Sequence, residues 1–145
     1  MDPTGMVHAL ETVHRQLVPG GRLIDIHPSG EAPPLFLRAD SRQTLIGWLG
    51  ETDYFIEYRQ ADRAVAEAVS AGLFSLEDHQ EFMFETQAED IGRLVEFLNA
   101  NWSDAVLEER LSERASRLQH QASGPSAIIL AERVQILKLV SRRED

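Results

Sequence analysis

The chain has 145 residues, of which 24 are acidic and 14 are basic, so its formal net charge at pH 7 is −10. This charge disfavours nucleic acid and anionic membrane surfaces as partners, because both repel an acidic domain. The absence of cysteine excludes disulfides, thiolate zinc sites and cysteine nucleophiles. The length suits a single domain over residues 1–145. Neither a signal peptide nor an apolar run long enough for a membrane helix is visible, so we expect a cytoplasmic protein.

The first predicted elements are a helix and a buried strand. Apolar side chains recur at helical spacing from Met6 to Leu17, and Pro19-Gly20-Gly21 ends that helix. The following segment, Arg22–His27, is rich in branched aliphatic residues, which is typical of a strand. A helix, a tight turn and an apolar strand make half of an α/β unit.

The rest of the chain alternates between predicted strands and helices. We expect a hairpin over residues 35–38 and 43–48, a helix capped by Thr52 or Asp53 and ending at Gly72, a strand over 81–86, a helix over 88–100, a helix capped by Ser103, and a strand over 127–140. The last of these segments is so apolar that both faces of the strand should be covered. These patterns predict one α/β domain without repeats or linkers.

The segment around the Pro-Gly-Gly turn resembles the helix–turn–strand segment before the fifth strand of class I S-adenosylmethionine (SAM)-dependent methyltransferases. The matching positions are Leu10, Arg15, Leu17, Pro19, Gly20, Gly21, Leu23, Ile24 and Ile26. The two glycines permit a sharp reversal with positive φ, so that a helix can fold back onto a sheet.

The resemblance implies a partial Rossmann-like methyltransferase sheet made of the fifth, sixth and seventh strands with flanking helices and a small hairpin. In the family the seventh strand is inserted antiparallel between the fifth and the sixth. Arg22–His27, Glu81–Thr86 and Glu132–Val140 would be these strands, in the order fifth, sixth and seventh. The hairpin and the segment from Ala88 to Gln121 would be insertions that vary within the family.

The resemblance also implies SAM as cofactor, but the family's binding motif is absent from this chain. That motif is a glycine-rich turn after the first strand together with an acidic residue that ends the second. No glycine-rich turn precedes Pro19, and Gly20-Gly21 is no substitute because it leads into a strand. No cofactor-binding residue is therefore assigned. The chain resembles the carboxy-terminal half of a methyltransferase and is expected not to turn over SAM alone.

Two groups of residues are candidates for the pocket that holds the methyl acceptor. Asp25 and His27 share one side of the strand near its carboxyl end, where ligands bind in open α/β sheets. They could be a general base or a substrate-orienting pair, or a polar strand end satisfied by its neighbours. Trp48, Tyr54 and Tyr58 could line the same pocket or form the packing face of the following helix.

No other catalytic or metal-binding pattern is present in the sequence. His8, His14, His79 and His120 are scattered, and His14 with Glu11 lacks a third ligand, so we expect no metal site. Motifs of serine hydrolases, phosphate-binding loops and zinc proteases are also missing.

The expected strand edge at Leu23–Ile26 leads to a prediction about partners. In the resembled family the fifth strand pairs with the fourth, so without the fourth an apolar edge is left open. We expect a second copy of the chain or a separate amino-terminal methyltransferase half to cover this edge. The alternative to a methyltransferase-like protein is a non-catalytic dimeric or regulatory module derived from one.

Overall fold

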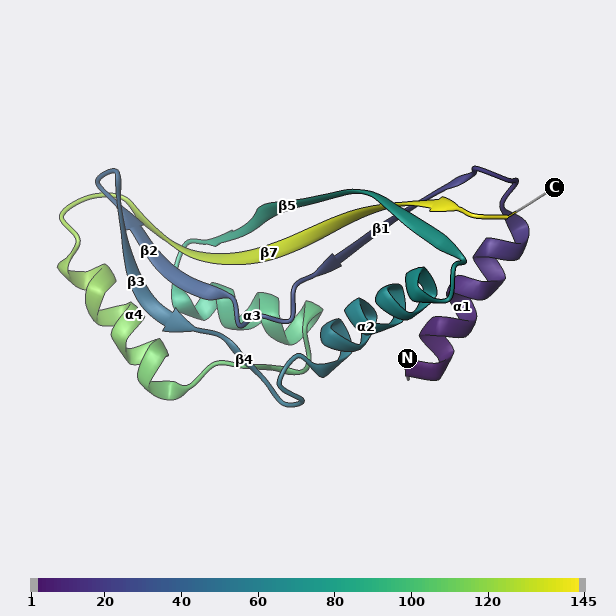
Figure 1. The fold of residues 1–145 in the computed structure, drawn as a ribbon. Coiled ribbons are helices and arrows are strands. Elements are labelled where there is room, and N and C mark those ends of the chain that lie inside the picture. The colour runs from purple at the N-terminus through teal and green to yellow at the C-terminus, as the bar shows by residue number, and fades with distance from the viewer. Residues whose placement is uncertain (1–2, 144–145) are drawn as a thin grey trace. The chain divides into compact units, whose positions relative to one another are not determined.

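The computed structural model describes residues 3–143, which form four helices and seven strands (Figure 1). The helices are α1 (Pro3–Gln16), α2 (Ile56–Ser70), α3 (Ile91–Asn101) and α4 (Glu109–Gln121). The strands are β1 (Arg22–Pro28), β2 (Pro34–Ala39), β3 (Arg42–Trp48), β4 (Gly50–Glu51), β5 (Phe74–Ala88), β6 (Ala105–Val106) and β7 (Ser126–Ser141).

Strand β7 organises the main sheet. Its carboxy-terminal half pairs antiparallel with β1, its amino-terminal half pairs antiparallel with β2, and β5 also pairs with β7. Strand β3 continues the sheet beyond β2 as the predicted hairpin, and β4 with β6 forms a separate small sheet. The described chain divides into two compact units: the first comprises residues 3–30, 56–82 and 133–143, and the second residues 31–55 and 83–132.

In the first unit, α1 and α2 cover one face of the strands (Figure 1). Alternation along β1 directs Leu23, Asp25 and His27 to this face, opposite Leu139, Leu137 and Gln135 of β7. The core beneath the helices consists of buried Val65, Ala68, Phe74, Leu137 and Leu139, with Leu10, Leu17, Leu23, Val69 and Leu73 packed around it.

The other face of β1 carries exposed apolar residues. Ile24 is 51% exposed and Ile26 is 59% exposed, and they lie opposite Lys138 and Ile136 of β7. Glu77 of β5 accepts hydrogen bonds from Arg22 and forms an ion pair of 2.7 Å with Lys138. We call this face, with Ile24 and Ile26, the open face of the first unit.

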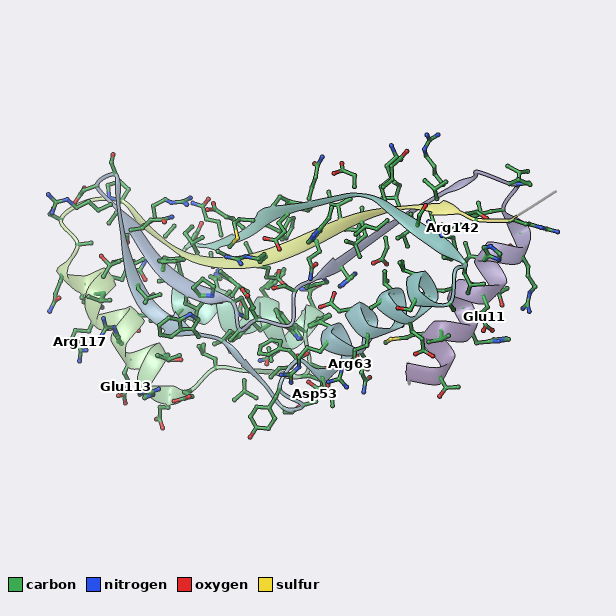
Figure 2. The ribbon with its side chains drawn as sticks, viewed as in Figure 1. Glu11, Asp53, Arg63, Glu113, Arg117 and Arg142 are labelled. Atoms are coloured by element: carbon green, nitrogen blue, oxygen red, sulfur yellow. The ribbon has the colours of Figure 1, made fainter. Side chains whose placement is uncertain are left out.

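The second unit has its own core between the β2–β3 hairpin, α3 and α4. Its buried residues are Leu35, Leu37, Ile46, Leu49, Leu94, Leu98, Leu111, Ala115, Ile128 and Leu130. Gly47 lies against Leu111, since a Cβ atom at Gly47 would come within 2.5 Å of Leu111 Cδ2. On the outer side of α4, Glu113 and Arg117 point away from the sheet (Figure 2), as expected for a solvated helix face.

The mixed α/β class is confirmed, but the sheet is not the predicted Rossmann-like one. The path β1-β7-β2-β3 is not a Rossmann-like order, and each pairing whose register is given is antiparallel. The physical reason lies in β7, whose 16 residues are long enough to pair with β1 and β2 one after the other. Five consecutive buried residues, 127–131, show that only the amino-terminal half of β7 is covered on both faces.

Three element boundaries differ from the sequence predictions. Helix α2 starts at Ile56 because residues 52–55 form a turn in which Tyr54 and Phe55 have positive φ. Helix α4 begins at Glu109 and not near Ser103, because Ala105–Val106 pairs with β4 as β6. Strand β5 has 15 residues, more than twice the six predicted, because it already begins at Phe74; Glu77 in this first part forms an ion pair with Lys138 of β7.

Candidate functional site

Asp25, His27 and Asp62 form a hydrogen-bonded cluster in the first unit. His27 Nδ1 lies 2.6 Å from Asp25 Oδ2, and His27 Nε2 lies 2.6 Å from Asp62 Oδ1 on α2. Gln135 of β7 donates its side-chain amide to the same Asp62 oxygen at 3.3 Å. The cluster therefore joins β1, α2 and β7 beneath the helices.

The cluster holds its imidazole in the charged form. His27 is only 9% exposed, and burial alone would favour the neutral ring. The hydrogen bond to Asp25 outweighs burial, and together with Asp62 and the charges of both carboxylates it raises the pKa of His27 to about 9. At neutral pH both ring nitrogens thus carry protons and donate to carboxylates.

This geometry does not suit His27 to act as a general base. A base must offer an unprotonated nitrogen within reach of the substrate, and both nitrogens of His27 are engaged by Asp25 and Asp62. Of the interpretations left open by the sequence, these contacts argue against the general base, because the neighbours of His27 engage both of its ring nitrogens. The imidazolium links β1 to α2 through its hydrogen bond with Asp62.

Asp25 also faces a pocket between α1 and α2. The pocket has a volume of about 280 Å³. Apart from Asp25, its described lining consists of apolar side chains of α1, α2 and β1, with Met6, Leu10 and Val65 among them. Asp25 is the one polar residue in this lining among residues 3–143. Oδ1 of Asp25 has no hydrogen-bond partner among residues 3–143, since the contact with His27 uses Oδ2.

The three aromatic candidates occupy different places. Trp48 ends β3 with 57% of its surface exposed, and Tyr54 lies in the turn before α2 with 79% exposed. Neither is part of the packing face of α2. The buried aromatic residue of that segment is Phe55, which packs edge-to-face against Trp102. Tyr58 lies on α2 in the first unit, while Trp48 and Tyr54 belong to the second.

The remaining histidines have local roles. His14 packs edge-to-face against Phe74, with ring centroids 5.3 Å apart. Nδ1 of His8 lies 3.6 Å from Glu11 Oε2, and Nε2 of His79 lies 4.0 Å from Glu81 Oε1. Nδ1 of His120 lies 3.1 Å from the carbonyl oxygen of Ser116. Within residues 3–143 no group of three or more histidine, aspartate or glutamate side chains is arranged to hold a metal ion.

Asp62 is the member of the cluster that the sequence analysis missed. It lies four residues after Tyr58 and three before Val65, at the border of the apolar stripe of α2. A carboxylate at the border of a packing stripe is the sequence signal that could have indicated Asp62. The sequence does not reveal that His27 is its partner, because that contact depends on how α2 lies over β1.

Comparisons with models of protein families, with curated proteins and with solved structures find no match to this chain. Among the described residues no helix is long and apolar enough to cross a membrane.

Proposed function

We propose that this chain is a SAM-dependent methyltransferase-like protein that corresponds to the carboxy-terminal half of a class I enzyme and does not turn over SAM alone. The observation that carries the proposal is the position of β7, which pairs antiparallel with β1 and also pairs with β5. The resemblance implies this neighbourhood for the fifth, seventh and sixth strands. The pairings with β2 and β3 belong to the predicted hairpin insertion.

The turn between α1 and β1 supports the same proposal. Gly20 has a φ of +69°, in the left-handed region that favours glycine. Gly21 has another role, because a Cβ atom there would lie 2.8 Å from the carbonyl oxygen of Val18. The geometry of the turn that brings α1 back over the strand therefore favours glycine at both positions.

In the proposed enzyme the chemistry is in-line displacement at the sulfonium methyl group, catalysed mostly by alignment of the acceptor. The cofactor would be held by an amino-terminal half that carries the glycine-rich turn, which these 145 residues do not contain. Asp25 and His27 are not proposed as a catalytic base, because the imidazolium is held by two carboxylates.

The proposal can be tested by calorimetry and amide hydrogen exchange. The chain alone is expected to give no binding heat with S-adenosylhomocysteine, the demethylated product. Fusing the cofactor-binding half of a class I methyltransferase ahead of residue 3 should protect the amides of residues 22–28 from exchange, because a fourth strand would pair with β1. Micromolar binding by the chain alone, or unprotected β1 amides in a folded fusion, would contradict the proposal.

A second candidate is a non-catalytic dimeric or regulatory module derived from a methyltransferase. It is favoured by the open face, where Ile24 and Ile26 are more than half exposed on a strand that ends the sheet path. This candidate predicts a dimer in solution and no protection of β1 by the added cofactor half. The same fusion therefore separates the two candidates.

A further inference from the structure

We propose that the pocket between α1 and α2 binds a small amphiphilic amine, with its apolar body against the two helices and its ammonium group on Asp25. The inference does not depend on the proposed function, because it uses only the lining of this pocket and the charges of the cluster beside it. It rests on the pocket lining, on the charge of the cluster beneath it, and on the free oxygen of Asp25.

The lining selects the body of the ligand. Besides Asp25, the described lining is apolar, with Met6, Ala9, Leu10 and Val13 from α1, Ala61, Ala64 and Val65 from α2, and Leu23 from β1. An apolar lining of this kind suits a phenyl ring or a short alkyl chain. The volume of about 280 Å³ is near the lower end of the range of about 300–1,000 Å³ found for small-molecule sites.

The charge selects the head group. Asp25 and Asp62 place two carboxylates around the single imidazolium of His27, which leaves one uncompensated negative charge. Among the described residues, no basic side chain lines the pocket. An ammonium group would supply the missing positive charge, whereas an anionic ligand would be repelled.

The contacts of Asp25 show where the head group would bind. Its Oδ2 accepts from His27, and Oδ1 is left for a further donor. The carboxyl group is 28% exposed, so a ligand can reach it, yet it is shielded enough that a charge-assisted hydrogen bond would not be fully screened. Asp62 binds the other nitrogen of the His27 ring. His27 and Asp25 therefore keep their positions when the ligand binds.

The test is a titration of the full 145-residue protein with matched ligands, followed through backbone amide spectra. We expect 2-phenylethylamine and 4-phenylbutylamine to shift the amides of Ala9, Ala61 and Ala64 in a saturable way. The neutral 2-phenylethanol should bind about tenfold more weakly, the difference a hydrogen bond to a charged group typically makes. Phenylacetate should not bind.

Two variants and a control make the test specific. Asp25→Asn should remove the preference for amine over alcohol, while Ala61→Leu should fill the pocket and abolish binding of both with the Asp25 charge intact. Glu11→Gln removes a negative charge from α1 outside this pocket and should leave binding unchanged (Figure 2 labels Glu11). Equal affinities for amine and alcohol in the native protein, no saturable shift with either amine, or full binding by Ala61→Leu would overturn the proposal.

Discussion

His27 and Asp62 join strand β1 to helix α2 through a contact of 2.6 Å between residues 35 positions apart in the sequence. Because Asp25 holds the other ring nitrogen at the same distance, the imidazolium lies between two negative charges with little exposure to water. A buried charge of this kind depends on its partners. Removing the imidazolium leaves both carboxylates without their shared cation, whereas removing one carboxylate leaves the ring paired with the other.

The first prediction follows from this dependence. His27→Ala should lower the free energy of unfolding by about 3 kcal/mol or more, since it leaves two carboxylates without their shared cation. Asp62→Asn should cost about 1 kcal/mol, because Asp62 is 41% exposed and Asp25 still pairs with the ring. Urea unfolding measures both. His8→Ala is the matched control at a histidine whose side chain is 69% exposed, and equal losses for His8→Ala and His27→Ala would contradict the assignment.

The second prediction concerns pH. The pKa of His27 is raised from 6.5 to about 9 on folding, so the native state keeps a proton that the unfolded chain releases. Its stabilisation is fully present below pH 6.5 and is lost as the pH rises towards 9, by at most about 3 kcal/mol. Unfolding measured at several pH values should show this decline in the native protein. In His27→Gln the decline over the same interval should disappear, and its persistence there would assign it to another group.

Part of this site could be predicted from the sequence. The side chains of Asp25 and His27 share a face because residues two apart in a strand always do, and the apolar segment around them identified the strand. Asp62 could not be assigned as their partner. The angle at which α2 lies over β1 decides that contact, and it follows from the packing of Val65 and Ala68 against β7, which no local pattern reveals.

The fold shows the same division between local and long-range effects. The hairpin and β1 were predicted because turn residues and branched aliphatics determine them locally. The length of β5 was underestimated because Glu77 and its neighbours look like a loop, whereas the ion pair with Lys138 supports a strand. The sequence predicts Ser103 as a helix cap, but Ala105–Val106 pairs with β4, so α4 begins only at Glu109.

The third prediction separates the two glycines of the turn after α1. Gly20→Ala should cost about 1 kcal/mol, because a φ of +69° disfavours a side chain, and Gly20→Asn should recover part of that loss. Gly21→Ala should cost about 2 kcal/mol through its clash with the carbonyl oxygen of Val18, and asparagine there should be no better. Thermal unfolding of the four variants tests the assignment. If asparagine were more stable than alanine at position 21 but not at position 20, the roles assigned to the two glycines would have to be exchanged.

The fourth prediction concerns the open face. Ile24 is more than half exposed on a strand that ends the sheet path, a combination that invites pairing with another chain. Light scattering after gel filtration should therefore show association of the native protein at high concentration. Ile24→Lys should shift the population to monomer and cost up to about 1 kcal/mol of stability, because the new lysine would lie directly opposite Lys138 of β7.

Val18→Lys provides the control for this measurement. Val18 is 70% exposed but precedes the strand, so a lysine there adds the same charge without reaching the open face, and association should persist. A native protein that stays monomeric at high concentration would exclude pairing with a second copy. The hydrogen-exchange experiment on the fusion would then decide what covers β1. In that fusion the cofactor-binding half can supply a strand beside β1 without self-association.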